Sequence, residues 1–187
     1  QLGLVRVRSI EELMFTAALL EKTGVLQGEG VAVLSASGGM GELAADYADL
    51  EGVDLPRLAA GTLAALSSTL PPMATPANPL DLTGAVVNKP ELFLDCMQAL
   101  EQDPAVSVLV CVFDVPTDLN NDWAPFAVGS LQAIGRFKPE GRVRGLAISN
   151  TGNYGSDRSR AEGGAAGRPY LPCGLEVGRE AVRHALG

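Results

Sequence analysis

Three short strand-like runs constrain the fold of this chain more than any other feature of its sequence. They span residues 31–34, 106–113 and 143–149, and stretches with apolar side chains at helical spacing alternate with them. A run that is apolar almost throughout is typical of a strand covered on both faces, and strands that alternate with helices are typical of a parallel sheet. We therefore predict an α/β fold of the flavodoxin-like kind, a doubly wound and mainly parallel sheet with helices on both faces.

Helical patterns occupy most of the sequence between these runs. They predict helices over residues 10–20, 40–50, 62–70, 91–101, 123–137 and 175–186. Residues 74–84 contain two prolines and predict an ordered loop, and residues 170–172 predict a last short strand. The polar, glycine-rich residues 152–167 predict a loop with or without a short helix.

The first predicted helix follows a short lead-in, residues 4–7, which we expect to be extended. Ser9 and Glu12 have the spacing of a capping box, in which both side chains bind free N–H groups at the helix start. The apolar side chains at helical spacing are Ile10, Leu13, Met14, Ala17 and Leu20. Gly24 follows them as a plausible end of the helix.

The charge of the chain argues against several classes of partner. The formal net charge is −8 and no cluster of Lys or Arg offsets it, which argues against nucleic-acid binding. The longest strand-like apolar run, residues 106–113, is far shorter than the roughly 20 residues of a membrane span. The chain begins with Gln1 and without a signal-peptide pattern, so we expect a fragment or trimmed chain of a cytoplasmic protein that binds no membrane.

The cysteines predict no disulfide and no metal site. Cys96, Cys111 and Cys173 are widely separated and form no CxxC pair or other ligand spacing. Two of them lie within apolar runs, which predicts buried free thiols in a reducing compartment. No group of carboxylates has the spacing of a metal site either.

A glycine-rich turn, SASGGMG at residues 35–41, joins the first strong strand to its helix. Glycine permits positive φ and lets a ligand approach the backbone closely. Free N–H groups and the positive end of the helix dipole favour a phosphate or carboxylate at the helix start. The turn also lies at the carboxyl end of a strand, where doubly wound sheets bind their ligands. It is therefore a candidate anion site, although a plain strand-to-helix turn with Ser37 as the N-cap has the same pattern.

Motifs that would assign a catalytic residue are absent. The turn has none of the patterns GxxxxGK[ST], GxGxxG or GxSxG. The one histidine, His184, lies beside Arg183 in the last predicted helix, which favours a solvated face or a helix-end cation over a catalytic base or phosphate acceptor. We assign no catalytic residue.

Polar side chains near the same edge of the sheet favour structural roles. Asp114 ends the central strand run in CVFDVP, where an aspartate can cap a loop. Asn78 and Asp81 lie in NPLDLTG, and their side chains can hydrogen-bond to the turn that carries them. We expect Asn78 and Asp81 to form a structural loop near the glycine-rich turn.

Several stretches together resemble the NDP-forming acyl-CoA synthetases, the relatives of succinyl-CoA synthetase. They are GVAVLSASGGMGELAADYADLEGVDLP, TLAALSSTLPP and ATPANPLDLTG, and the pairing of SGGMG with NPLDLTG about forty positions later is the most specific part. The match is to the second flavodoxin-like CoA-ligase domain of these enzymes. Residues 1–26 resemble the strand and joining helix before that domain, so we expect residues 27–187 to form the domain itself.

The resemblance implies a reaction and a role for the turn. These enzymes convert a carboxylate, CoA and NTP to acyl-CoA, NDP and phosphate through an acyl phosphate and a phosphohistidine. Helix N-termini from two flavodoxin-like domains face the phosphohistidine. Carried over to this chain, the N–H groups of Ser37, Gly38, Gly39, Met40 and Gly41 are the phosphate-binding groups. The family often has proline where Met40 stands.

The resemblance also implies that this chain works with other parts of a ligase. Its expected partners are a CoA-binding Rossmann domain, a histidine-bearing domain and an ATP-grasp domain, and its expected substrate is a small carboxylic acid. The full enzyme is expected to use CoA, ATP or GTP, and Mg²⁺, and the isolated chain to be inactive. Residues 149–167 match nothing in the family. Two alternatives stay open: a non-catalytic flavodoxin-like module for interaction or regulation, and a flavodoxin that binds flavin.

Overall fold

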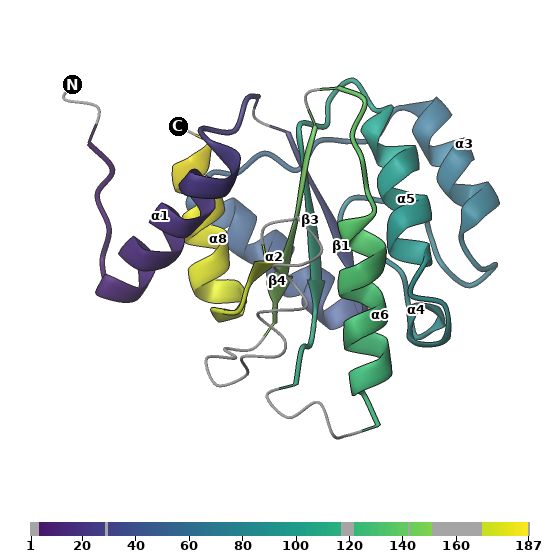
Figure 1. Ribbon diagram of the computed structural model, residues 1–187. Coiled ribbons are helices and arrows are strands. Elements are labelled where there is room, and N and C mark those ends of the chain that lie inside the picture. The colour runs from purple at the N-terminus through teal and green to yellow at the C-terminus, as the bar shows by residue number, and fades with distance from the viewer. Residues whose placement is uncertain (1–3, 29, 117–121, 142, 151–169, 187) are drawn as a thin grey trace.

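A five-stranded parallel sheet forms the centre of the molecule (Figure 1). The computed structural model describes residues 4–28, 30–116, 122–141, 143–150 and 170–186. Along the chain the elements are α1 (Ile10–Thr23), β1 (Val31–Ser35), α2 (Gly38–Glu51), α3 (Ala60–Thr69), β2 (Leu80–Asp81), α4 (Ala85–Asn88), α5 (Leu92–Glu101), β3 (Val108–Phe113), α6 (Ala124–Gly135), β4 (Arg144–Ser149), β5 (Tyr170–Leu171) and α8 (Gly174–Ala185). The strand order β2-β1-β3-β4-β5, with every pairing parallel, is the flavodoxin order. The predicted fold class is confirmed.

The two central strands are buried on both faces, as their apolar runs predict. All five residues of β1 and all six of β3 are buried. Val31 of β1 is paired with Val108 of β3, and Ser35 with Val112, so the carboxyl ends of both strands reach the same edge of the sheet. This edge carries the loops in which a doubly wound fold places its ligand sites.

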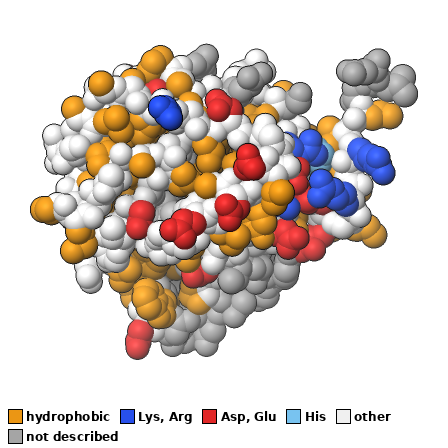
Figure 2. All heavy atoms as spheres, turned by 180° about the vertical axis from the view of Figure 1, so that it is seen from behind, with side chains coloured by type: hydrophobic (Ala, Val, Ile, Leu, Met, Phe, Trp, Pro, Cys, Tyr) orange, Lys and Arg blue, Asp and Glu red, His pale blue; other side chains and the backbone are white. Residues whose placement is uncertain are grey.

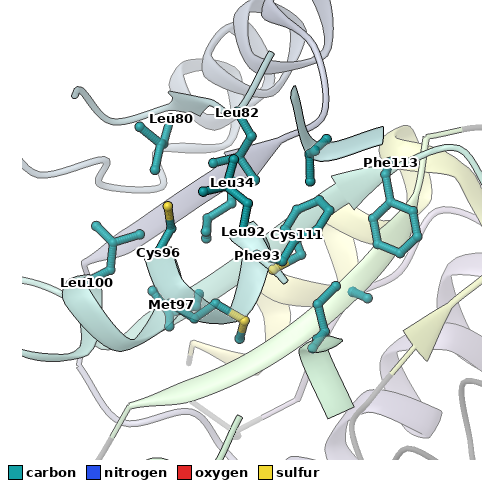
Figure 3. Close-up of a cluster of buried hydrophobic side chains, with 14 of the residues drawn as sticks. Leu34, Leu80, Leu82, Leu92, Phe93, Cys96, Met97, Leu100, Cys111 and Phe113 are labelled. Carbon is teal, nitrogen blue, oxygen red and sulfur yellow. The ribbon is translucent and has the colours of Figure 1, made fainter. Parts of the chain in front are cut away.

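The core has two parts, one on each face of the sheet. On one face, side chains of α3, α4, α5 and α6 pack against the sheet, and on the other, side chains of α1, α2 and α8. Figure 3 shows the centre of the first part, where side chains of α5 meet the strands and the residues around β2: Leu34, Leu80, Leu82, Leu92, Phe93, Cys96, Met97, Leu100, Cys111 and Phe113. The rings of Phe93 and Phe113 are 5.3 Å apart between centroids.

The structure contains two short elements, β2 and α4, that the sequence does not predict. The predicted loop at residues 74–84 contains β2, whose Leu80 pairs with Leu34 of β1. A one-turn helix, α4, follows directly. Both are too short to carry a periodic signal, and β2 is a strand only because β1 lies beside it. The predicted loop at residues 152–167 falls outside the described part of the chain.

Helix α1 exposes much of the apolar stripe seen in its sequence. Ile10, Leu13 and Met14 are 78%, 52% and 62% exposed, whereas the buried side chains of the helix are Glu12, Thr16 and Leu19. Helix α1 is held to α8 by the buried Glu12–His184 contact and to the second part of the core by Leu19, with Phe15 and Leu20 packed beside it.

The start of α1 partly follows the predicted capping box. The Ser9 hydroxyl accepts a hydrogen bond from the Glu12 N–H at 3.0 Å, but the Glu12 carboxylate accepts one from the Arg8 N–H instead of the Ser9 N–H. Residues 4–8 belong to none of the strands of the sheet. Residues 4–9 form an arm at the outer edge of the molecule (Figure 1).

Candidate functional site

The glycine-rich turn leaves several N–H groups free at the start of α2. Ser37 is the N-cap residue, with extended backbone (φ −155°, ψ 153°), and its side chain makes no capping hydrogen bond. The first turn bonds only through the Gly41 N–H, which donates to the Ser37 carbonyl at 3.1 Å. Within the described residues, the N–H groups of Gly38, Gly39 and Met40 have no hydrogen-bond acceptor. Together with the helix dipole, they form an N-terminus that can bind an anion.

The turn is held in place from behind by a buried serine. The Ser35 hydroxyl donates to the Ser37 carbonyl at 2.6 Å, and Oγ of Ser35 accepts a hydrogen bond from the Ser37 N–H at 3.2 Å. The Ser35 carbonyl accepts the Leu82 N–H at 2.9 Å, and the Ala36 N–H donates to the Val112 carbonyl at 3.1 Å. The turn is therefore tied both to the β3 end and to the segment after β2, which preorganises its free N–H groups.

None of the three glycines of the turn has positive φ, and only Gly38 has a tight neighbour. Gly38, Gly39 and Gly41 all lie outside the positive-φ region, so that part of the sequence argument is wrong. A Cβ on Gly38 would lie 3.2 Å from Oδ2 of Asp81, whereas one on Gly39 would meet no atom within 4 Å. Gly41 faces Pro79, with 3.5 Å between its Cβ position and Pro79 Cβ. Gly39 is thus the open position through which a ligand can approach.

Asn78 and Asp81 connect this region to the sheet in different ways. Asp81 accepts the Thr83 N–H at 2.8 Å, the local turn that the sequence predicts. Asn78 does not bond to its own turn. Its amide accepts the Val33 N–H at 3.0 Å and donates to the Val31 carbonyl at 2.9 Å and the Pro56 carbonyl at 3.2 Å. The prediction that Asn78 bonds to its own turn is therefore wrong. Its side-chain amide instead bonds to backbone groups of β1, as a neighbouring strand would.

A cavity of about 460 Å³ adjoins the glycine-rich turn at the carboxyl edge of the sheet. Its lining includes Ser37, Met40, Val87, Asp114, Trp123 and Phe126. The walls are mainly apolar, and Trp123 and Phe126 stand edge to face with 6.3 Å between ring centroids. Asp114, at the end of β3, is exposed and contributes the carboxylate of the lining.

The sequence predicts the turn but not the cavity beside it. Val87 comes from the missed helix α4, and Trp123 and Phe126 come from the start of α6. The signal that could have found the last two is their position, since they follow a central strand and so return to its carboxyl edge. Their types alone are typical of core residues.

His184 lies near the end of α8, in a buried hydrogen-bonded contact with Glu12. Its Nε2 is 2.6 Å from Glu12 Oε1, and the two side chains are only 5% and 2% exposed. Burial alone would raise the pKa of Glu12, but the Arg8 N–H and His184 outweigh it and lower this pKa below its ordinary value. The prediction of a solvated His184 is wrong, although the residue does lie in the last turn of α8.

More charged side chains surround this pair and join α1, α2 and α8. We refer to the group as the helix charge cluster: Arg8, Glu12, Glu51, Arg179, Glu180, Arg183 and His184. Burial raises the pKa of Glu180, and the neighbouring Glu12 charge adds to this effect. Figure 2 shows most of the visible basic side chains gathered at this end of the molecule, near the N-terminal arm.

The cysteines are buried and free, as predicted. Burial raises the pKa of Cys96 and of Cys173 to about 12, and it raises the pKa of Cys111 further still. No three His, Cys, Asp or Glu side chains of the described residues form a group that could hold a metal ion. In the same residues, no helix has both the length and the apolar character to cross a membrane.

The fold and the turn define an α/β domain of flavodoxin topology, with free N–H groups at a helix start on the carboxyl edge of its sheet. Comparison with known proteins narrows this class. The chain is 31% identical over 134 residues to the alpha subunit of acetate–CoA ligase (ADP-forming) II of Pyrococcus furiosus, covering 72% of this chain and 29% of that subunit. It is 33% identical over 112 residues to acetate–CoA ligase (ADP-forming) I of Archaeoglobus fulgidus, covering 60% of this chain and 16% of that protein.

A structural comparison agrees with the sequence matches. A crystal structure from Pyrococcus horikoshii OT3 aligns with 98% of this chain and 41% of its own, with a TM-score of 0.77 and 28% identity. No family model matches the chain. The chain is a homologue of part of the NDP-forming acyl-CoA synthetases, at modest identity over most of its length, so the resemblance seen in the sequence is confirmed. It spans less than a third of the length of the curated relatives that it matches.

Proposed function

We propose that this chain is the second flavodoxin-like domain of an NDP-forming acyl-CoA synthetase, and that the start of α2 binds the phosphoryl group of a phosphohistidine carried by another domain. The observation that carries the proposal is the set of free N–H groups on Gly38, Gly39 and Met40. A phosphoryl group bears negative charge on several oxygens and gains most from N–H dipoles that are fixed before it arrives. The Ser37 hydroxyl, which makes no capping bond, is a further donor.

The surroundings of the turn suit a phosphoryl group that a partner domain brings and removes better than a phosphate that stays bound. The Gly39 position is open, and the cavity beside the turn gives a partner domain room to insert a loop. The Asp81 carboxylate lies next to Gly38 and carries charge of the same sign as phosphate. The repulsion weakens the binding of a free phosphate. A phosphoryl group that is attached to a partner domain can still be brought to the turn and withdrawn from it.

The chain's own contribution to the reaction is binding and orientation. In this proposal the nucleophilic histidine, the CoA site and the ATP-grasp site lie in other domains or subunits, and these supply CoA, ATP or GTP, and Mg²⁺. Two of the curated relatives are named as acetate–CoA ligases and a third as a trans-feruloyl-CoA synthase, so these names support a carboxylic acid as the substrate class. The isolated chain holds the phosphoryl site and is not expected to turn over alone.

Titration with inorganic phosphate, followed by amide NMR shifts, tests this binding site. We expect saturable shifts centred on residues 38–40, with a Kd in the millimolar range or weaker, because a few neutral donors in water bind an anion only weakly. Gly39→Pro removes one N–H at a helix position that tolerates proline and should abolish or strongly reduce the shifts. Gly39→Ala is the matched control, since its Cβ meets no atom and its N–H stays.

Two results would contradict the proposal. One is an absence of saturable shifts at residues 38–40 in the wild-type chain. The other is equal binding by the Pro and Ala variants, which would show that the Gly39 N–H is not used. Either result would favour the alternative, a non-catalytic interaction or regulatory module with this fold.

A further inference from the structure

The cavity beside the glycine-rich turn shares two residues with the proposed phosphoryl site. Ser37 and Met40 belong to the turn and also line the cavity, and the Met40 N–H is one of the free donors. In an acyl phosphate, a single bridging oxygen joins the acyl group to phosphorus. A phosphoryl group at the start of α2 therefore brings the acyl group of the same molecule to this cavity.

The cavity is far larger than an acetyl group needs. Its volume is about 460 Å³, which lies within the range of sites for small organic ligands. In another protein, an apolar cavity of about 150 Å³ is enough to bind benzene. The cavity of this chain can therefore hold a ring and its linker and still leave room for a partner loop at the turn. A single methyl group would leave most of it to water.

One wall of the cavity is aromatic. Trp123 and Phe126 come from the start of α6, which lies beside α4 and its Val87 on one face of the sheet (Figure 1). Phe126 stands edge to face with Trp123 and also with Phe113 of the core, whose ring centroid is 6.0 Å away. Trp123 is the most exposed of these three rings, at 59%. A ligand ring can extend this row, because aromatic pairs gain from such contacts beyond the area that they bury.

The charges of the lining favour a monocarboxylic acid. The described residues of the lining include one carboxylate, that of Asp114, and no Lys or Arg. A dicarboxylic acid would place its far carboxylate in this cavity, near Asp114 and without a cation to pair with it. Such a charge is costly to bury, so the cavity disfavours substrates of that kind.

We infer that the cavity holds the hydrocarbon part of the acyl phosphate and selects an aryl-substituted monocarboxylic acid over acetate. The inference rests on the proposed function, because the acyl group reaches the cavity from a phosphoryl group bound at the start of α2. Each methylene that the cavity buries raises the affinity roughly fourfold, and acetate has only one methyl group to bury. Trp123 is the specificity-determining residue, since its ring is the exposed part of the aromatic wall.

Phosphonates test the cavity on the 187-residue chain, because their phosphonate group resembles the phosphoryl group and does not hydrolyse. We expect benzylphosphonate to bind roughly tenfold or more tightly than methylphosphonate. Both should shift the amides of residues 38–40 in NMR spectra, and benzylphosphonate alone should also shift those of Val87 and Phe126. Trp123 is the only tryptophan of the chain, so its fluorescence reports on the cavity directly. Phosphonoacetate, which adds a carboxylate, should bind more weakly than methylphosphonate.

Substitution of Trp123 tests the aromatic wall. Trp123→Ala should lower the affinity for benzylphosphonate about five- to tenfold and change that for methylphosphonate less than about twofold, whereas Trp123→Phe should keep most of the affinity. Leu50→Ala is the matched control, because Leu50 is 73% exposed on α2 and outside the lining, and it should bind both phosphonates like the wild type. Circular dichroism checks the fold of each variant.

The outcomes separate this inference from the proposed function. Equal affinities for the two phosphonates, with both bound at residues 38–40, would overturn the inference and leave the proposed function intact. Absence of binding at residues 38–40 for every phosphonate would overturn the proposed function and the inference with it. A preference for benzylphosphonate that Trp123→Ala leaves unchanged would show that the ring binds elsewhere. Phosphonoacetate that binds as tightly as methylphosphonate would contradict the preference for monocarboxylic acids.

Discussion

His184 Nε2 lies 2.6 Å from Glu12 Oε1, in a pair buried between two helices from opposite ends of the chain. This contact explains why α1 presents its apolar stripe to solvent. Leu19 is buried in the core, and Phe15 and Leu20 pack partly buried beside it. The contact of α1 with the rest of the fold therefore combines a buried ionisable pair with apolar packing.

Loss of the pair should release α1 before the rest of the fold. We expect His184→Ala to lower the free energy of unfolding by about 3 kcal/mol, because the Glu12 carboxylate stays buried with only part of its compensation. Hydrogen exchange should show the amides of α1 opening more than those of β3. Urea unfolding and exchange of Lys22→Ala, an exposed change on the same helix, should match the wild type within about 0.5 kcal/mol. Uniform loss of protection in all elements would contradict a selective role.

Sequence patterns predict a helix or strand well where the pattern shows which of its faces are buried. Strands β1 and β3 are apolar throughout because both faces of the sheet are covered, so the sequence is sufficient for them. The stripe on α1 reports only that one face is apolar, and it cannot say what covers the helix. Glu12 and His184 are 172 positions apart, and no local pattern joins them.

The same limit applies to the candidate site. The turn is visible in the sequence because glycines and a helix start are local features. The cavity beside it needs Val87 and Trp123 to meet at one edge of the sheet, which only the assembled fold provides. Strand β2 is likewise set by its neighbour β1 and not by its own two residues.

Substitution of Gly38 should disturb the candidate site through Asp81. A Cβ at this position lies 3.2 Å from the Asp81 carboxylate, so Gly38→Ala displaces the carboxylate or the start of α2. We expect a loss of about 1 kcal/mol in stability and an altered amide shift for Thr83, whose N–H donates to Asp81. Gly39→Ala should change neither the stability by this amount nor the Thr83 shift. Unchanged Thr83 shifts in the Gly38 variant would show that the two segments are not coupled.

The Asn78 amide should be worth more to stability than its place in a loop suggests. Asn78→Ala leaves the Val33 N–H and two carbonyls without their partners, and we expect a loss of about 2 kcal/mol in the free energy of unfolding. Asn78→Asp keeps an acceptor for Val33 but sets a carboxylate against the carbonyls of Val31 and Pro56, so it should destabilise about as much. Chemical denaturation measures both. An Asp variant as stable as the wild type would show that the two donated bonds contribute nothing.

Asp103 should make the stability of the chain depend on pH in the acid range. Its buried carboxylate accepts the N–H groups of Ala59 at 2.7 Å and Ala105 at 3.0 Å. Burial alone would raise its pKa, but these bonds and one from the Thr62 side chain outweigh it, so the pKa is lowered in the folded chain. A carboxyl with a lowered folded pKa stabilises the fold above its unfolded pKa, and this contribution is lost as pH falls through the folded value.

Asp103→Asn measures that contribution directly. At pH 6 the variant should be less stable than the wild type by about 1–2 kcal/mol, because the amide offers one acceptor oxygen in place of two. The difference should shrink as pH falls below the ordinary aspartate pKa of about 4, because the unfolded wild-type chain then binds a proton at Asp103 that the folded chain does not yet bind. Asp46→Asn, an exposed change on α2, should give no such trend. Urea unfolding at several pH values measures both differences, and a gap between wild type and Asp103→Asn that stays constant down to pH 2 would contradict the assignment.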